Sequence, residues 1–386
     1  MERKFRIGII GCGGIANSKH MPSLTRQPNA ELVAFCDIVE ERAQKACEEF
    51  GAEGAKVYTD YKALLKDETI DIVHVCTPNR EHSFITVDAL EAGKHVMCEK
   101  PMAINGEEAQ KMLDAAERTG KKLSIGYQNR YRPDSWYLKR ACEADELGEI
   151  YYAKAHAVRR RGVPTWGVFI DEYEQGGGPL IDIGTHALDL TLWMMDNYKP
   201  KLVVGSVFKK LGGQKECGNM WGDWDAEKIT VEDSAFGYIV MQNGAAISLE
   251  SAWALNTLDV IEAKTTLCGT KAGADMRDGL RINRVKYNKW TTEQVDIDSA
   301  NIPYRGAKPE KASDTEARLW LCLLYTSRRG RRGPHADDRE ARVRHATASV
   351  SISRRRGSRR SFMICAAMPH RITTAPESMQ TSIRRL

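Results

Sequence analysis

The segment GGGPLIDIGTHALDL, residues 176–190, places a carboxylate and an imidazole four residues apart directly after three glycines. In a helix Asp182 and His186 would share one face, because residues i and i+4 are neighbours there. The surrounding apolar residues indicate burial, and a buried polar group needs a partner. A satisfied core pair is the ordinary explanation of such a pattern. The alternative is acid–base chemistry, since an imidazole takes or relays protons near neutral pH.

The N-terminal stretch carries a dinucleotide-binding fingerprint. The apolar run FRIGII precedes Gly11-x-Gly13-x-x-Ala16, and a helix-like segment follows. The first glycine permits the tight turn, the second permits close approach of the pyrophosphate, and Ala16 permits close packing of helix on strand. The start of the helix then offers free N–H groups to phosphates. We therefore predict a cofactor site here that also includes Gly14 and Ile15.

Asp37 ends the second apolar run, AELVAFCD, at the distance expected for the ribose-binding acid of this fingerprint. Its carboxylate would accept a hydrogen bond from the adenosine ribose and repel a 2′-phosphate. No arginine follows directly in DIVEE to compensate that repulsion. The predicted cofactor is NAD rather than NADP.

Strand-like and helix-like segments then alternate through TIDIVHVCTP, KHVMCEKP and KKLSIGY. This alternation predicts a doubly wound parallel sheet with its ligands at the carboxyl ends of the strands. His74 lies inside a strand, which indicates a packed core histidine. His82 follows the TPN turn at the start of a helix, and two roles are open for it: contact with the cofactor or a purely structural role. The other residues that follow strand ends, and are predicted to contact the cofactor, are Thr77, Pro78, Asn79, Glu99, Lys100 and Gln128.

From Ile150 onward the pattern changes to longer strand-like runs. Asn243-Gly244 between two apolar runs is a strong hairpin signal. The predicted fold class is α/β, with an N-terminal doubly wound Rossmann domain followed by an α/β domain that has a large, mostly antiparallel sheet. The predicted boundaries are residues 1–123 and 124–321.

The composition excludes several classes of protein. Of 386 residues, 42% are hydrophobic and 28% charged, which is typical of an ordinary soluble globular protein. The ten cysteines include no Cys-x-x-Cys pair, and no metal site is predicted. No signal peptide or membrane span is evident, so we expect a cytoplasmic protein with no membrane partner. The net charge of +5 comes from the C-terminal segment, so no nucleic-acid partner is expected.

That C-terminal segment differs from the rest of the chain. Residues 327–386 hold fifteen arginines, no lysine and four acidic residues. Hydrophobic periodicity stops near Leu324, which is typical of a disordered basic arm. The motif CLLYTS, residues 322–327, is what the end of a library-preparation transposon encodes in one frame. We therefore expect residues 322–386 to be either disordered or a sequencing or translation artefact.

Four ordered motifs, GIIGCGGIA, CTPNREH, EKP and GGGPLIDIGTHALDL, resemble the glucose–fructose oxidoreductase, inositol dehydrogenase and rhizopine-catabolism (Gfo/Idh/MocA) family over residues 4–320. The resemblance implies NAD(P)-linked chemistry on sugars or polyols and a homo-oligomer. It places the catalytic residues on Lys100, Asp182 and His186. In this family the bond that corresponds to Lys100–Pro101 is often cis. The Arg-rich tail departs from the family, whose members continue with further helical sequence.

Oxidation of a sugar CH–OH requires loss of a hydride and of a proton. Lysine has a reference pKa of about 10.4, so it acts as a base near neutrality only where its surroundings lower that value. Asp182 would hold the imidazole or bind a sugar hydroxyl, and Asp189 would pair structurally. The glycines before Asp182 would let the chain pass close to the cofactor or substrate. The predicted substrate-binding residues are Lys100, Arg130, Trp166, Asp182 and His186.

Two of these features have open alternatives. Trp166 either stacks on a sugar or packs in the core, and Arg159 to Arg161 form either a solvated charge run or part of the pocket. The predicted function is an NAD-dependent oxidoreductase acting on a sugar, polyol or glycoside. The alternatives are an NAD-retaining, redox-assisted glycosidase that uses the same three residues, and a non-catalytic sugar sensor.

Overall fold

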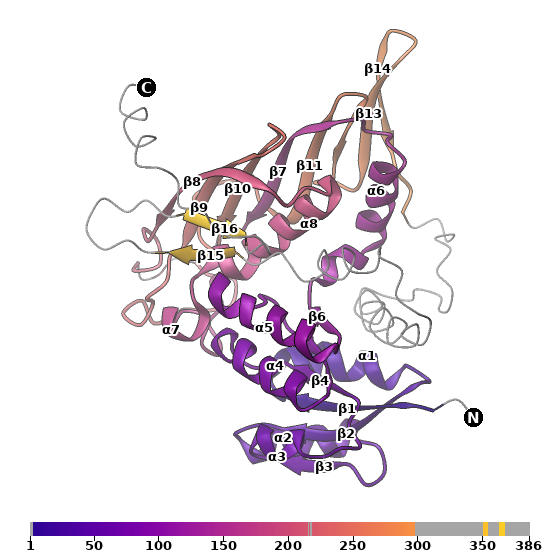
Figure 1. The fold of residues 1–386 in the computed structure, drawn as a ribbon. Coiled ribbons are helices and arrows are strands. Elements are labelled where there is room, and N and C mark those ends of the chain that lie inside the picture. Colours follow the sequence, from indigo (N-terminus) through magenta and orange to yellow (C-terminus); the bar gives the residue numbers. More distant parts are fainter. Residues whose placement is uncertain (1–2, 215, 217, 298–349, 354–362, 367–386) are drawn as a thin grey trace, which may run out of the picture.

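The computed structural model describes residues 3–214, 216, 218–297, 350–353 and 363–366, and two large sheets organise them (Figure 1). The first sheet is six-stranded and parallel, in the order β3-β2-β1-β4-β5-β6. Its strands are β1 (Phe5–Ile10), β2 (Ala30–Cys36), β3 (Lys56–Tyr58), β4 (Ile72–Val75), β5 (His95–Cys98) and β6 (Leu123–Ile125). The strand order reverses direction between β1 and β4, the place where such sheets bind ligands.

Helical segments connect these strands, as the alternating pattern predicts. Several of them pack against the sheet, as α2 does on β2 and α4 on β4 and β5, whereas α6 packs against α8 (Thr185–Met195). The Asn105 side chain caps α5 by accepting from the Glu108 N–H. The segments are η1 (Ala16–His20), α1 (Met21–Thr25), α2 (Glu40–Phe50), α3 (Tyr61–Leu65), η2 (Asn79–Glu81), α4 (His82–Glu91), α5 (Gly106–Thr119), η3 (Gln128–Tyr131) and α6 (Pro133–Glu143).

The second sheet is eight-stranded, in the order β14-β13-β12-β11-β7-β10-β9-β8. Every neighbouring pair is antiparallel except β7 and β10, which run parallel. The strands are β7 (Ile150–Val158), β8 (Pro200–Phe208), β9 (Ser234–Met241), β10 (Ala246–Ala252), β11 (Ile261–Gly269), β12 (Ala272–Asp275), β13 (Arg281–Lys286) and β14 (Lys289–Gln294). Both the fold class and the hairpin at Asn243-Gly244 are confirmed, and Gly244 has a φ of +91°.

Helix α8 (Thr185–Met195) covers one face of the second sheet and packs against β7 and β11 (Figure 1). It follows the short helix α7 (Glu172–Gln175) and a π-helical turn, η4 (Leu180–Gly184). Almost every residue of η4 and α8 is buried. The segment that carries Asp182 and His186 is therefore part of the core of the second domain.

Two strands lie within the Arg-rich segment. β15 (Val350–Ser353) and β16 (Met363–Ala366) pair antiparallel, whereas the sequence predicts no strand period there. The expectation of disorder or artefact for residues 322–349, 354–362 and 367–386 lies outside the described residues.

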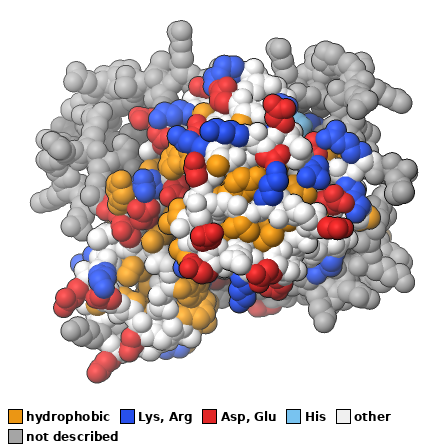
Figure 2. Space-filling model, turned by 90° about the horizontal axis from the view of Figure 1, so that it is seen from below, with side chains coloured by type: hydrophobic (Ala, Val, Ile, Leu, Met, Phe, Trp, Pro, Cys, Tyr) orange, Lys and Arg blue, Asp and Glu red, His pale blue; other side chains and the backbone are white. Residues whose placement is uncertain are grey.

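On the face seen in Figure 2, basic and acidic side chains alternate over the coloured surface, with apolar side chains between them.

Candidate active site

The glycine loop after β1 has the geometry that its sequence predicts. Gly11 has a φ of +90°, and a Cβ there would lie 2.6 Å from the Cys76 carbonyl oxygen. Gly13 and Gly14 have nothing within 4 Å of a would-be Cβ, so open space lies beside them. Ile15 is 38% exposed, and Ala16 is fully buried where the helical segment begins. The loop can therefore admit a phosphate close to its backbone.

Asp37 lies at the end of β2, beside this loop. One carboxylate oxygen accepts from the Cys12 N–H at 2.9 Å, and the other accepts from the Val39 N–H at 2.9 Å. These two hydrogen bonds from backbone amides hold the carboxylate where the fingerprint predicts the ribose to bind. Each oxygen still has acceptor capacity for a hydroxyl group.

The loops after β4 and β6 contain buried polar atoms without a partner among the described residues. These are the Thr77 hydroxyl and the Gln128 amide oxygen. Both residues are among the predicted cofactor contacts. Because unpaired buried polar groups are uncommon, the two atoms fit a bound molecule that offers hydrogen bonds.

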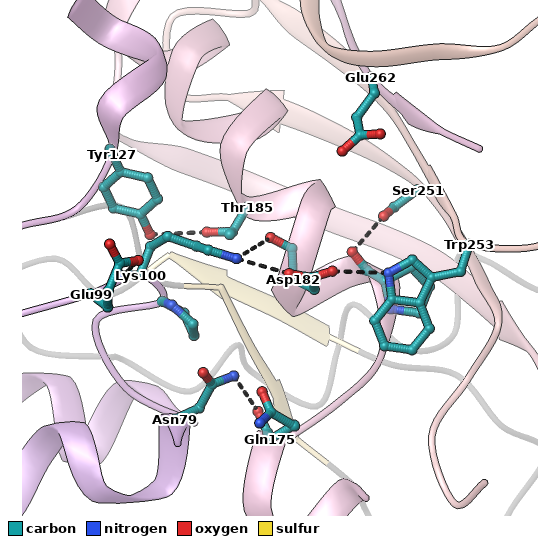
Figure 3. A network of polar contacts seen from close by, with 12 residues as sticks. Asn79, Glu99, Lys100, Tyr127, Gln175, Asp182, Thr185, Ser251, Trp253 and Glu262 are labelled. Atoms are coloured by element: carbon teal, nitrogen blue, oxygen red, sulfur yellow. Dashed lines mark hydrogen bonds and ion pairs between the residues drawn. The ribbon is translucent and has the colours of Figure 1, made fainter. Parts of the chain in front are cut away.

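Two other residues predicted to contact the cofactor form hydrogen bonds to the protein backbone instead. The His82 ring nitrogens lie 2.7 Å from the Pro101 carbonyl oxygen and 2.9 Å from that of Thr77, so the ring joins two loops. Asn79 donates to the Gln175 carbonyl oxygen and ties η2 to α7 (Figure 3). Both side chains position the loops, and their amide and ring nitrogens already have partners.

Glu99 is held by a histidine that sequence reasoning missed. The His20 Nε2 lies 2.7 Å from Glu99 Oε1, and the other Glu99 oxygen accepts from the Lys100 N–H at 3.0 Å. Burial raises the pKa of Glu99, but its contacts with His20 and Lys100 outweigh that effect and lower it. The core histidine His74 lies 3.3 Å from His20 and is buried, as predicted. His20 thus links the glycine-loop helix to the lysine loop.

Lys100 reaches across from the first domain to Asp182 (Figure 3). Its Nζ donates to Asp182 Oδ1 at 2.8 Å and to the Asp182 backbone oxygen at 3.3 Å. The other carboxylate oxygen accepts from the Trp253 indole N–H at 3.0 Å. Burial raises the pKa of Asp182, but Lys100 outweighs it and the net shift is downward, so the carboxylate is ionised. The Lys100–Pro101 bond is cis, as the family resemblance implies.

His186 lies in the same buried region, with its ring edge-on to Tyr127 at 6.3 Å between centroids. Its Nδ1 has no hydrogen-bond partner among the described residues, and no described hydrogen bond joins it to Asp182. Of the two roles expected for Asp182, holding the imidazole is therefore not the one observed. Burial and then the charge of Lys100 lower the pKa of His186 to about 3, so the imidazole is uncharged at neutral pH.

Arg130 and Trp166, predicted to bind substrate, have other contacts. Arg130 Nε donates to Asp189 Oδ2 at 2.8 Å, and its Nη2 donates to the other oxygen, so the guanidinium forms a two-point buried pair. The structural role expected for Asp189 is observed. Trp166 is 51% exposed and meets the Trp221 ring edge-on at 5.0 Å. It belongs to a surface aromatic group rather than to the core.

Two of the glycines before Asp182, Gly176 and Gly178, pass close to other parts of the protein. A Cβ on Gly178 would lie 2.2 Å from the Glu232 carbonyl oxygen. The Glu232 side chain accepts from the N–H groups of Gly178 at 2.9 Å and Leu180 at 3.3 Å. Glu232 therefore caps the start of the turn that carries Asp182, a role that no local pattern indicates.

Comparison with known proteins identifies the family. Residues 5–127 match the oxidoreductase family with an NAD-binding Rossmann fold, and residues 136–275 match the GFO/IDH/MocA C-terminal domain. The chain belongs to the Gfo/Idh/MocA oxidoreductase family. The glycine loop and the orphan polar atoms of Thr77 and Gln128 fit the dinucleotide that this family's first domain binds.

Relatives in the family include named dehydrogenases. The chain is 43% identical over 271 residues to the D-glucoside 3-dehydrogenase of Escherichia coli (strain K12), covering 70% of this chain and 76% of that protein. It is 32% identical to the inositol 2-dehydrogenase of Salmonella typhimurium (strain LT2), but spans only 56% of that protein's length. Levoglucosan dehydrogenase in complex with NADH and L-sorbose has the same fold, with a TM-score of 0.70 at 20% identity, over 84% of this chain and 90% of that one.

Within the described ranges, every helix is too short or too polar to span a membrane. No group of three or more His, Cys, Asp or Glu side chains in the same residues is arranged to hold a metal ion.

Proposed function

We propose that this chain oxidises the C3 hydroxyl of a D-glucoside and uses NAD as the hydride acceptor. The observation that carries the proposal is the Lys100–Asp182 contact of 2.8 Å beside the buried, uncharged imidazole of His186. The identity to a D-glucoside 3-dehydrogenase supports the choice of substrate and carbon.

The residues that would hold NAD are those of the glycine loop, Asp37, Thr77 and Gln128. When bound, NAD supplies the acceptor for the hydride that leaves the carbon. The Asp37 carboxylate supports NAD over NADP, because a 2′-phosphate would lie beside a negative charge.

Lys100 transfers the proton. A lysine ammonium has three N–H groups, and Lys100 directs its bonds to the Asp182 carboxylate and backbone oxygen, which leaves donor capacity for a substrate oxygen. In the direction of oxidation, the ammonium first releases a proton to solvent, to which its side chain is 17% exposed, and the resulting amine then accepts the hydroxyl proton as the carbonyl group forms. In the reverse direction, the ammonium returns that proton.

Asp182 and His186 position the reacting groups. Asp182 is fixed by Trp253 on its other oxygen, so Lys100 is held at one point rather than swinging freely. Because His186 is uncharged, its imidazole can accept a hydrogen bond from a sugar hydroxyl as well as donate one. The pair of side chains therefore orients the hydroxyl towards Lys100.

The test is a panel of D-glucosides and polyols incubated with NAD, read by NADH absorbance and by product analysis. A 3-keto product formed with stoichiometric NADH is the expected result. Cleavage of an aryl glucoside without net NADH would instead identify a redox-assisted glycosidase. Turnover of inositols but of no glucoside would overturn the substrate assignment.

A further inference from the structure

A pocket of about 600 Å³ lies on the second domain and takes no part in the proton transfer above. Its volume is typical of a site for a small molecule. Six of the residues that line it are Arg159, Arg160, Met220, Trp221, Val260 and Glu262.

The pocket adjoins the catalytic pair through the backbone. Arg159 follows β7 directly, and its N–H donates to the Ala252 carbonyl oxygen at 2.8 Å at the end of β10. The next residue, Trp253, holds Asp182 through its indole N–H. Burial raises the pKa of Asp182 and lowers that of His186. The charges of Lys100 and Arg159 then lower both pKa values, so Arg159 lies close to both side chains. A sugar bound at Lys100 would therefore have a substituent within reach of this pocket.

Arg159 forms part of the pocket wall and contributes little free charge. Its Nε donates to Glu262 Oε2 at 2.7 Å, its Nη2 donates to Oε1 at 2.5 Å, and its guanidinium lies 5.1 Å from the Trp221 ring centre. This two-point pairing neutralises the one carboxylate in the lining. A negatively charged ligand would therefore not meet an unpaired acid there.

Arg160 supplies the charge that remains. It is exposed and forms no ion pair with any described residue. Its neighbour Arg161 also lines the pocket. Guanidinium groups bind carboxylate and phosphate in a planar, two-point geometry. The pocket is therefore built to receive an anion.

Three other lining residues are apolar. Met220 is 66% exposed, Trp221 40% and Val260 50%, so the protein leaves large apolar side chains open to solvent here. The Trp221 ring is fixed edge-on against Trp166 and beneath Arg159, which presents a rigid surface. Rigid aromatic surfaces of this kind bind flat apolar groups.

We infer that this pocket binds the aglycone of the glucoside substrate, and that the preferred aglycone is a flat apolar group bearing a carboxylate or a phosphate. The inference rests on the proposed function for the position of the sugar. It adds a class of substrate, acidic aryl glycosides, and assigns Arg160 as a residue that determines specificity.

The test measures binding, so that it does not depend on turnover. Isothermal titration of the full chain with NADH present would compare phenyl, 4-carboxyphenyl and 4-phosphonooxyphenyl D-glucosides, each as both anomers. We expect an acidic glucoside to bind at least about tenfold more tightly than the phenyl glucoside, which equals about 1.4 kcal/mol. The stronger of the two acidic arms identifies the anion.

Variants assign that preference to Arg160. In Arg160→Met the ratio of the two dissociation constants is expected to fall towards one, and in Arg160→Lys it is expected to be partly retained. Lys289→Met removes one exposed charge from the distant β13–β14 hairpin and is expected to keep the wild-type ratio. A wild-type ratio near one, or a full ratio in Arg160→Met, overturns this inference alone. Failure of every glucoside to bind overturns the proposed function as well.

Discussion

Two buried ion pairs join the loops that follow β5 and β6 to one helical segment of the second domain, and they differ in whether a donor group remains accessible. Lys100 pairs with Asp182 in the π-helical turn, and Arg130 pairs with Asp189 in α8. The Arg130–Asp189 side chains are 8% and 2% exposed, whereas those of Lys100 and Asp182 are 17% and 11% exposed. Both pairs are largely buried, but only the lysine pair keeps some access to solvent.

The donors of the two pairs explain the difference further. Arg130 uses two nitrogens on both oxygens of Asp189 and lies against the rings of Tyr127 and Trp193. Lys100 uses its single nitrogen on one side of Asp182 and keeps donor capacity. A buried ion pair can act as a reactive site when one N–H donor stays unused and a substrate can still reach it. A fully satisfied pair contributes specificity of packing instead.

The largest expected effect comes from removing proton transfer while keeping the charge. Lys100→Arg should reduce the rate of single-turnover hydride transfer by about 10²–10⁴, close to the loss in Lys100→Ala, because a guanidinium does not give up its proton. Rapid mixing with NAD and substrate measures this rate, and thermal melting checks that the fold is retained. An Arg variant with most of the wild-type rate would make Lys100 a fixed charge and His186 the base.

The second prediction concerns stability and separates the two pairs. Asp189→Asn should reduce the free energy of unfolding by about 3–5 kcal/mol, because Arg130 is left buried without its counter-charge. The matched change Asp182→Asn should cost less, since Lys100 has partial access to solvent. Urea unfolding of both variants measures the difference. Equal losses in the two variants would remove the distinction drawn above.

A third carboxylate, Asp37, extends the comparison because its described partners are backbone amides. Asp37→Ala should relax the preference for NAD over NADP by about tenfold, or about 1.4 kcal/mol, through loss of repulsion of the 2′-phosphate. Fluorescence titration with NADH and NADPH gives the ratio of dissociation constants. An unchanged ratio would mean that the loop, not the carboxylate, selects the cofactor.

The smallest predicted effect is on pH dependence. Burial, followed by the charge of Lys100, lowers the pKa of His186 to about 3, below the reference value of about 6.5. Between these values the unfolded chain binds a proton that the folded chain does not, so stability falls as the pH falls. From about pH 7 to about pH 5.5, His186→Gln should lose about 1 kcal/mol less stability than the wild type. Identical losses in urea unfolding would show that folding does not lower the pKa of His186.

The first domain was the more predictable part, because its signals are local. Strand, glycine turn and helix succeed one another along the chain, and Gly11, Gly13 and Asp37 follow from that order alone. The first sheet does extend to Ile125, just past the predicted boundary at residue 123. Asp182 and His186 were found because apolar residues surround them in the sequence.

The residues that the sequence did not reveal contact partners that lie far away along the chain. His20 and Glu99 are 79 positions apart, and Asp182 and Trp253 are 71 apart, so no window of sequence contains either pair. For the same reason the predicted substrate role of Arg130 was not separable from its pairing with Asp189. Spatial partners decide which polar residue is left available, and sequence patterns do not report them.

The hairpin formed by β13 and β14 gives only a weak signal in the sequence. Its strands are mostly exposed, so the alternation of apolar and polar residues that marks a half-buried strand is weak. Tyr287 and Asn288 form its turn with φ values of +51° and +61°. Asn288 is the one local signal that favours such a turn, since asparagine tolerates this conformation.

The parallel pairing of β7 with β10 has a consequence for how the enzyme folds. The helix that carries Asp182 and His186 lies in the connection between these two strands, and so do β8 and β9. The centre of the sheet closes only after the chain has made a long-range contact around that whole connection, and such contacts form slowly. During refolding, the dinucleotide domain should form early, and substrate turnover should return only with the last and slowest phase.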